Sequence, residues 1–344
     1  MKAVRMVGVG RSLEQSWIEV REPQAGEVRV RIEAAGICHS DAHYRGGASP
    51  MGALPITLGH EIAGVIAAAG PGVSRVAVGD RVCLHYLVTC GRCTDCRAGR
   101  EQFCERGAMI GHHVDGGFAE SIVVPERNAV RLPAEVSFEV GAILMCSSAT
   151  ALHALRKARL RAGESVAVFG VGGLGISAVQ IANVLGATEV YAVDVRSEKL
   201  ALAARHGALG IPGGTAEAVA EIRRRTSGRG VDVALELVGR PDTMRQALQV
   251  LAPLGRAVVA GLGVRSLEID PYVELMGREA ELIGTNDHLL TELVELVELA
   301  RNGKLDLADA VSQRVPLEAG AINQVLDDLE HFRGGTRAVI VPSR

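Results

Sequence analysis

The sequence predicts an α/β protein of two domains, in which a β-rich part precedes a doubly wound parallel sheet. Its 344 residues exceed the length at which a single hydrophobic core usually stops growing. Residues 1 to about 146 hold short apolar runs separated by turn residues, a pattern typical of a β-barrel or β-sandwich. From about residue 147 onward, strand-like runs alternate with helix-like stretches, which indicates βαβ units and a parallel sheet.

Four segments of the first part carry the strand signal. Residues 27–33 (EVRVRIE) alternate polar and apolar side chains with a period of two, as a half-buried strand does. Residues 62–67, 81–85 and 118–124 are short apolar runs between turns that contain Gly, Pro or Asp. We expect these segments to be strands of one β domain.

The second part begins with a buried-strand run at 165–169 (SVAVF), followed by a glycine-rich turn and a helix that continues to Gly186. A further strand at 189–193 ends at Asp194. The alternation continues with predicted helices at 197–206, 242–251, 290–300 and 317–329, and predicted strands at 231–235, 256–260 and 337–341.

Composition narrows the class of partner. Hydrophobic residues make up 48% of the chain and aromatic residues only 3%, so the cores and the lining of any pocket are expected to be mainly aliphatic. The net charge is −3, both signs are interspersed, and no run rich in Lys or Arg stands out. Nucleic acid is therefore not expected as a partner.

The N-terminus has no apolar run long enough for a signal peptide, and we expect no later segment to span a bilayer. Four of the seven cysteines crowd into residues 90–104. In a chain without a secretion signal such cysteines indicate bound metal rather than disulfides. The sequence thus predicts a cytoplasmic protein with no membrane partner.

The glycine-rich turn has the spacing of a dinucleotide site. Gly170, Gly172 and Gly175 follow a strand and open a helix, and Asp194 comes 19 residues later. The glycines allow the backbone to approach a pyrophosphate at a helix N-terminus, where the intervening Gly173 and Leu174 also lie. Asp194 favours NAD over NADP because it accepts hydrogen bonds from a ribose and repels a 2′-phosphate. Arg196 could pair with that phosphate, which leaves NADP open.

The most specific pattern is Cys90-x2-Cys93-x2-Cys96-x7-Cys104. Four thiolates close a tetrahedron around zinc and leave no open position, which describes a structural site. An iron–sulfur cluster also takes four cysteines, but no second cluster motif accompanies this one. A protein-binding zinc module is a further reading of the same four residues.

A second group of metal-binding residue types lies between residues 38 and 61. Cys38 and His60 can supply two of the three protein ligands that a catalytic zinc uses. Cys83 lies in an apolar strand run, where a free cysteine is usually a small core residue. Cys146 lies at the junction of the two parts, where a ligand can help to form a cleft.

These motifs, in this order, resemble the zinc-dependent medium-chain alcohol dehydrogenases over essentially the whole chain. The carrying segments are GICHSDAH at 36–43, GHExxGx5G at 59–70, the cysteines of 90–104, Cys146 with Thr150, and the glycine-rich βαβ unit. The shorter microbial members, which are usually tetramers, are the most similar. The resemblance implies a GroES-like catalytic domain at 1–147 and 289–344, with the structural zinc lobe at 90–104, and a Rossmann NAD-binding domain at 148–288.

The resemblance also implies roles for single residues. Cys38, His60 and Cys146 would hold the catalytic zinc, Asp41 would orient His60, and Glu61 would lie behind the metal and transiently bind it. Ser40 would take the alcohol proton and pass it through the cofactor ribose to His43. Contacts to the cofactor are implied for three further residues: His39 near the pyrophosphate, Thr150 near the nicotinamide and Arg337 near the phosphates.

The implied reaction transfers hydride from a zinc-bound alkoxide to NAD, so that a primary or secondary alcohol becomes an aldehyde or ketone. The expected cofactors are two zinc ions per chain and NAD. The alternatives are a polyol, amino-alcohol or sugar dehydrogenase, in which Gly is common where His39 stands here, a zinc-free quinone reductase, and a zinc-stabilised NAD-binding sensor. A homotetramer or homodimer is expected, with the apolar stretches 257–263 and 282–285 as candidates for sheet extension across a two-fold axis.

Overall fold

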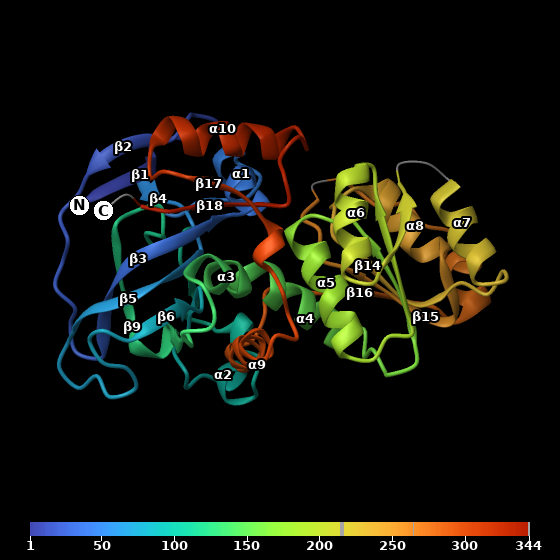
Figure 1. Cartoon of the computed structure of the whole chain (residues 1–344), viewed down its shortest axis with the longest axis horizontal. Helices are drawn as coiled ribbons and strands as arrows, with labels where there is room; N and C mark the ends of the chain where they lie inside the picture. The colour runs from blue at the N-terminus through green and yellow to red at the C-terminus, as the bar shows by residue number, and fades with distance from the viewer. Residues whose placement is uncertain (214–216, 264, 343–344) are drawn as a thin grey trace. The chain divides into compact units, whose positions relative to one another are not determined.

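The computed structural model describes residues 1–213, 217–263 and 265–342, which form two compact units (Figure 1). Unit 1 comprises residues 1–146, 288–303 and 307–344. Unit 2 comprises residues 147–287 and 304–306. In each range the account below concerns only the residues that the structure describes.

Unit 1 is built on a mainly antiparallel sheet in which β3 (Glu27–Ile37) is central. It pairs on one edge with β5 (Glu61–Ala69) and β9 (Ser121–Pro125), and on the other with β18 (Arg337–Ile340). The apolar side chains of β3 alternate inward, and β18 brings the C-terminal segment onto the first strand-rich part of the chain. The other strands are β6 (Arg81–Leu84), β10 (Ala129–Arg131) and β17 (Val311–Val315) in this sheet, β1 (Lys2–Met6), β2 (Glu14–Trp17) and β4 (Ile56–Thr57) in a second, and β7 (Leu87–Val88) with β8 (Ala108–Met109) in a third.

The helices of unit 1 surround these sheets. α10 (Ala319–Glu330) packs beside α1 (His39–Gly46), and the largely buried Arg45 joins them through Asp327, at 2.6 Å, and Glu330, at 2.8 Å (Figure 1). The others are α2 (Thr94–Arg97), α3 (Phe138–Ile143), α9 (Leu290–Arg301) and the 3-10 turns η1 (Glu101–Phe103), η2 (Glu126–Asn128) and η6 (Ala308–Ala310).

Unit 2 is a parallel sheet of order β13-β12-β11-β14-β15-β16, so the strand order reverses beside β11 (Ser165–Phe169). This is the doubly wound arrangement, and the predicted fold class is confirmed. The other strands are β12 (Glu189–Asp194), β13 (Leu209–Pro212), β14 (Val231–Glu236), β15 (Leu251–Val259) and β16 (Glu281–Gly284). The helices are α4 (Ala149–Lys157), α5 (Gly173–Val184), α6 (Ser197–Arg205), α7 (Glu217–Arg225) and α8 (Pro241–Gln249), with short helical turns η4 (Pro271–Leu275) and η5 (Met276–Arg278).

One boundary in unit 2 differs from the prediction. The expected helix 242–251 ends at Gln249, and the expected strand 256–260 begins five residues earlier, at Leu251. Leu251 already pairs with Val231 of β14. Pro253 and Gly255 conceal this early start, because both residues weaken a strand pattern in a sequence.

The expectation that no segment is long and apolar enough to span a bilayer is wrong for residues 138–157. This run is continuous as α3, the π-helical turn η3 (Leu144–Ser148) and α4, with a mean hydropathy of 1.4 over its most apolar window. Since 78% of that window is buried in the structure, its burial is that of a core helix.

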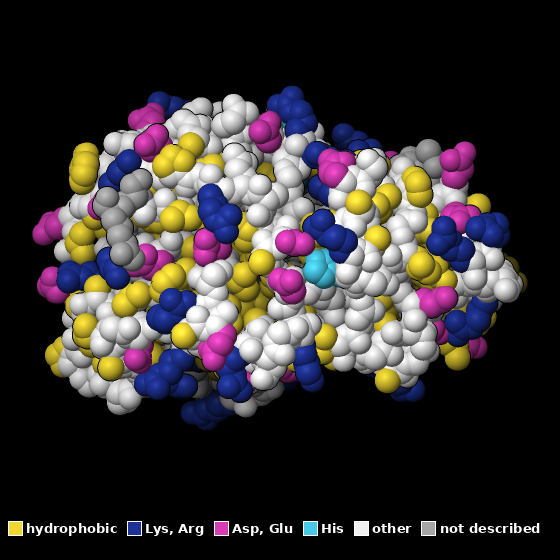
Figure 2. All heavy atoms as spheres, viewed as in Figure 1, with side chains coloured by type: hydrophobic (Ala, Val, Ile, Leu, Met, Phe, Trp, Pro, Cys, Tyr) yellow, Lys and Arg dark blue, Asp and Glu magenta, His cyan; other side chains and the backbone are white. Residues whose placement is uncertain are grey.

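Charged side chains are distributed evenly over the surface that Figure 2 shows. Basic and acidic groups are interspersed on both units, and neither sign forms a continuous patch on this face. Many of the basic side chains are paired locally, as Arg301 is with Glu298 at 2.7 Å and Arg224 with Glu221 at 2.8 Å.

Candidate metal centres and cofactor site

Three segments of unit 1 bring four buried ligand-type side chains together. Cys38 follows β3 at the N-cap of α1, His60 and Glu61 begin β5, and Cys146 lies in the π-helical turn η3. β3 and β5 are neighbours in the register Gly36↔Glu61, so the end of one strand meets the start of the other. Gly36 must be glycine, because a Cβ atom there would clash with the Glu61 carboxylate.

The ligand atoms of Cys38, His60, Glu61 and Cys146 all lie within 4.8 Å of one another. All four side chains are buried. In the described part of the chain, neither ring nitrogen of His60 and neither carboxylate oxygen of Glu61 has a hydrogen-bond partner. Buried polar atoms are normally satisfied, so this orphaned sulfur, nitrogen and oxygen donor set fits a metal ion of the zinc type.

Asp41 fixes the two segments that carry Cys38 and His60. Its Oδ2 accepts a hydrogen bond from Cys38 N at 2.8 Å, and its Oδ1 accepts one from Gly59 N at 3.2 Å. The same Oδ1 lies 3.4 Å from His60 Nδ1. This carboxylate is therefore placed to orient the imidazole so that its Nε2 is free for a metal.

The two buried thiols of this cluster influence each other. A hydrogen bond from Cys146 lowers the pKa of Cys38 well below its ordinary value, and Arg337 and His60 act in the same direction. The same contact, together with burial, raises the pKa of Cys146. One thiolate is thus favoured by the protein alone, and a coordinated metal ion deprotonates the second.

Glu61 has a cation behind it. The guanidinium of Arg337 lies 3.3 Å from Glu61 Oε1 and donates a hydrogen bond to Ile37 O at 3.2 Å. Burial raises the pKa of Glu61 to about 7, although Arg337 opposes this shift. The resemblance implies Arg337 near the cofactor phosphates, whereas the structure shows its guanidinium buried against Glu61.

Helix α1 carries the residues of the expected proton path. Ser40 Oγ lies 3.6 Å from Cys38 Sγ. The rings of His39 and His43, four residues apart on one helix face, stack with centroids 4.8 Å apart, and the exposed Phe332 covers His39 at 5.2 Å. Burial lowers the pKa of both imidazoles, which favours their neutral forms.

The surroundings of His60 are aromatic, not aliphatic as the composition suggested. The rings of Tyr44 and Tyr86 lie edge-on to His60, with centroids 6.4 Å and 5.3 Å away. His112 packs on Tyr44 at 4.5 Å, and His288 packs on Tyr86 at 4.7 Å. Sequence reasoning missed His288 because only the fold brings it beside Tyr86.

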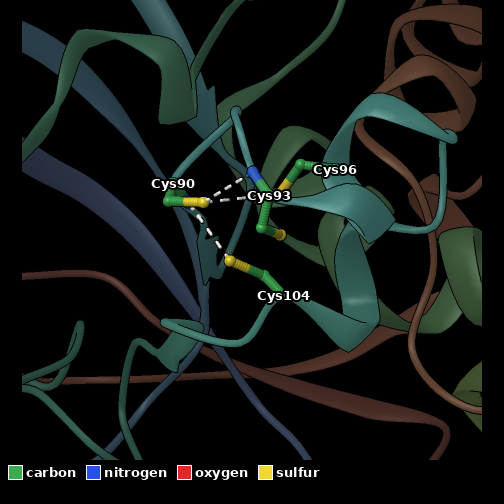
Figure 3. Close-up of side chains that lie close together, drawn as sticks. All are labelled: Cys90, Cys93, Cys96 and Cys104. Atoms are coloured by element: carbon green, nitrogen blue, oxygen red, sulfur yellow. Dashed lines mark hydrogen bonds between the residues drawn. The ribbon is translucent and has the colours of Figure 1, made fainter.

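The second cluster lies within one loop. The sulfur atoms of Cys90, Cys93, Cys96 and Cys104 lie within 4.8 Å of one another, and Figure 3 shows the four side chains turned toward a common centre. Cys93 N donates to Cys90 Sγ and Cys90 N donates to Cys104 Sγ, both at 3.3 Å. Backbone N–H groups of Arg92 and Cys93 lower the pKa of Cys90 to about 5, so the loop stabilises a thiolate there.

Cys83 belongs to neither cluster. Its thiol is buried in β6 and donates a weak hydrogen bond to Val130 O at 3.6 Å. Burial raises the pKa of Cys83 to about 12, so the side chain is a neutral thiol. It behaves as the core residue that its apolar neighbours predicted.

In unit 2 the glycine-rich turn connects β11 to α5. Gly170 has a φ of +93°, and a Cβ atom on Gly175 would clash with Gly170 O, so both positions require glycine. Gly172 is the N-cap of α5, whose first residues are Gly173 and Leu174. The N–H groups of this first turn are available to an anion.

Asp194 ends the neighbouring strand, β12, and lies against the turn. Its Oδ2 accepts a hydrogen bond from Val171 N at 2.7 Å, and its Oδ1 accepts one from Arg196 N at 2.9 Å. Thr150, the second residue of α4, also lies in unit 2. Unit 2 thus has the phosphate-binding turn and the acidic strand end of a dinucleotide site.

Comparison with known proteins gives the same result for both units. The family model described as the alcohol dehydrogenase GroES-like domain matches residues 24–134, and the model described as zinc-binding dehydrogenase matches residues 173–299. The NAD-dependent alcohol dehydrogenase of Sulfurisphaera tokodaii is 35% identical over 353 residues, which cover 99% of this chain and 100% of the relative. The chain belongs to the zinc-dependent alcohol dehydrogenase family.

Solved structures of this family superpose over the whole chain. The alcohol dehydrogenase of Aeropyrum pernix has a TM-score of 0.91 at 36% identity and covers 99% of this chain and 100% of its own. A protein of Sinorhizobium meliloti 1021, described as a zinc-binding dehydrogenase and solved with NADP, has a TM-score of 0.89 at 30% identity, with 99% of each chain covered.

Proposed function

We propose that this protein is an NAD-dependent alcohol dehydrogenase with two zinc ions per chain, which interconverts a primary or secondary alcohol with its aldehyde or ketone. The observation that carries this proposal is the buried cluster of Cys38, His60, Glu61 and Cys146, separate from a loop whose four cysteines leave no open ligand position. The relatives named NAD-dependent alcohol dehydrogenase support the choice of substrate class and cofactor.

Cys38, His60 and Cys146 would hold the catalytic zinc. Two thiolates and a neutral imidazole balance its charge while leaving a ligand position for substrate. When bound, zinc supplies a Lewis acid that acidifies a coordinated hydroxyl group, and NAD accepts the hydride. Glu61, held by Arg337, lies against the same cluster and can act as a transient fourth ligand.

Protons leave the site through α1. Ser40, next to Cys38, takes the hydroxyl proton, and the partly buried His43 exchanges it with solvent. Ser40 alone is a poor acid or base, so its part is to pass the proton on. Asp41 keeps the Cys38 and His60 segments in register during this transfer.

The glycine-rich turn and Asp194 would hold the cofactor. The turn, with Gly170 and residues 172–175, offers backbone N–H groups to the pyrophosphate, and Asp194 accepts from the adenosine ribose. His39, Thr150 and Arg337 are proposed as further contacts to NAD.

A substrate panel tests the proposal. Purified protein with measured zinc content is given NAD and matched primary, secondary, polyhydroxylated and amino alcohols, and NADH formation is followed. Faster turnover of simple alcohols supports the proposal, and faster turnover of polyols or amino alcohols supports the alternative within the family. Binding of NAD without turnover of any alcohol would contradict the enzyme assignment and leave the sensor.

We also propose that the protein is a cytoplasmic homodimer or homotetramer. The seven free cysteines require a reducing compartment. In the described sheet of unit 2, β16 is an edge strand that pairs only with β15, and Leu282 on it is 37% exposed. Such an edge accepts a strand from a second copy. Light scattering tests this: Leu282→Lys should lower the molecular mass, and an unchanged mass would exclude this edge.

A further inference from the structure

The region beside Asp194 bears on the choice between NAD and NADP. Each carboxylate oxygen of Asp194 already accepts one backbone N–H, from Val171 and Arg196, so its position is fixed against the glycine-rich turn. A carboxylate oxygen has further acceptor capacity for a ribose hydroxyl. A 2′-phosphate in the same place would bring a second anion against it.

Two cations and a second carboxylate share this region, on or next to α6. The guanidinium of Arg196 contacts Glu198 through both Nε and Nη2, on the same oxygen, Oε1. Burial lowers the pKa of Lys199, with Asp194 opposing and Arg196 adding to the shift, so the ammonium lies near both. The charges of Asp194 and Glu198 therefore balance those of Arg196 and Lys199.

Arginine near the ribose is the residue type that accommodates a 2′-phosphate in dinucleotide folds. Here the Arg196 guanidinium is directed to Glu198 within its own chain. We propose that Glu198 is a positioning residue for coenzyme selection, which holds Arg196 away from the 2′-position and adds a second negative charge there. This inference rests on the proposed dinucleotide-binding function and extends it from one selectivity residue, Asp194, to two.

The expected effect is modest because the ion pair is exposed. The side chains of Arg196 and Glu198 are 31% and 58% exposed, and pairs of this kind contribute little in water. Removal of the Glu198 charge should therefore improve binding of a 2′-phosphate by about 3- to 10-fold. The gain should decrease as ionic strength increases.

The experiment measures binding of two nucleotides, so it needs no alcohol turnover. Isothermal titration calorimetry compares adenosine 2′,5′-bisphosphate with 5′-ADP for the wild type and for Glu198→Gln, which keeps the size of the side chain and removes its charge. Glu298→Gln is the matched control, because Glu298 makes a similar exposed pair with Arg301 in unit 1. We expect Glu198→Gln alone to shift the affinity ratio toward the bisphosphate.

A double variant identifies the residue through which Glu198 acts. In Arg196→Ala/Glu198→Gln the gain should disappear, because the freed guanidinium is what binds the 2′-phosphate. An unchanged ratio in Glu198→Gln with 5′-ADP binding intact, or a gain that persists without Arg196, would overturn this inference alone. Failure of the wild type to bind either nucleotide would overturn the proposed function itself.

Discussion

Unit 1 holds two clusters of four ligand-type side chains that differ in origin and burial. The cysteines of 90–104 come from one loop and are partly exposed, whereas Cys38, His60, Glu61 and Cys146 come from three distant segments and are buried. A loop can close around zinc with little help from the rest of the fold. A buried mixed cluster requires the packed sheet, and it leaves a ligand position that chemistry can use.

The difference shows why similar donor atoms serve different purposes. The loop sulfurs receive backbone N–H bonds that favour thiolates locally. In the buried cluster the charges are set by other side chains, with Asp41 beside His60 and Arg337 beside Glu61. Structural and catalytic roles are thus separated by burial and by the surrounding charges.

The largest expected effect is that of Cys146→Ser. Loss of this ligand should remove one of two zinc ions per chain and lower kcat by more than about 100-fold, since even outer-shell partners of a metal can cost that much. Elemental analysis and NADH formation measure both effects. Cys83→Ser, at a buried cysteine outside both clusters, should keep both ions. Full zinc content in Cys146→Ser would break the proposed ligand set.

Cys104→Ser makes the reverse change. It should also leave one zinc ion per chain, but now in the buried cluster, so that activity per folded molecule is retained while thermal stability falls. The reason is that a structural zinc contributes its binding free energy to folding. Differential scanning calorimetry with zinc analysis checks this. A variant that loses activity while its melting temperature is unchanged would contradict the division of roles.

Arg337→Met tests the charge balance that only the buried cluster has. Loss of the guanidinium leaves Glu61 as a buried carboxylate without its cation, and breaking such a pair costs about 3–5 kcal/mol of unfolding free energy. Chemical denaturation measures this cost. Adding Glu61→Gln should recover part of the loss, since the unpaired charge is then removed. No recovery in the double variant would mean that Arg337 acts through other contacts, such as that with Ile37 O.

His85 should give the smallest effect, on the dependence of stability on pH. It lies beside Glu101 of the cysteine loop, with Nε2 3.6 Å from Oε1, and packs against His288 and Tyr86. Burial, aided by Arg127, lowers the pKa of His85 to about 3. An unfolded histidine gains its proton near pH 6.5, so the unfolded state binds more protons between about pH 6.5 and 3. Stability from neutral His85 is therefore complete above pH 6.5 and decreases by up to about 1.4 kcal/mol per pH unit as the pH falls.

Replacement of His85 by Phe removes this titration while keeping a ring. Its acid denaturation should be less steep than that of the wild type, measured as unfolding free energy against pH. The exposed His331, whose Nδ1 contacts Asp327 O, is the control: His331→Gln should keep the wild-type slope. Equal slopes for all three proteins would show that His85 does not contribute to acid denaturation.

Local patterns predicted the parts of the molecule that depend on local interactions. The strand 165–169 has the predicted bounds because five buried residues precede a glycine turn. The family and the fold class followed from motifs of this kind and are confirmed. By contrast, residue spacing could pair Cys38 with His60 but could not choose between Cys83 and Cys146, which the family resemblance favoured. Contacts such as Glu61 with Arg337, or Tyr86 with His288, join residues far apart in the chain and became visible only in the fold.

X-ray absorption at the zinc edge tests the central claim most directly, because it counts sulfur ligands at about 2.3 Å from the metal. With one zinc in each cluster, the wild type should show an average of about three sulfur ligands per zinc, together with nitrogen or oxygen ligands. Cys146→Ser should shift the average to four sulfurs at half the zinc content. Four sulfurs per zinc in the wild type at full zinc content would contradict the account, because Cys38, His60 and Cys146 would then hold no zinc.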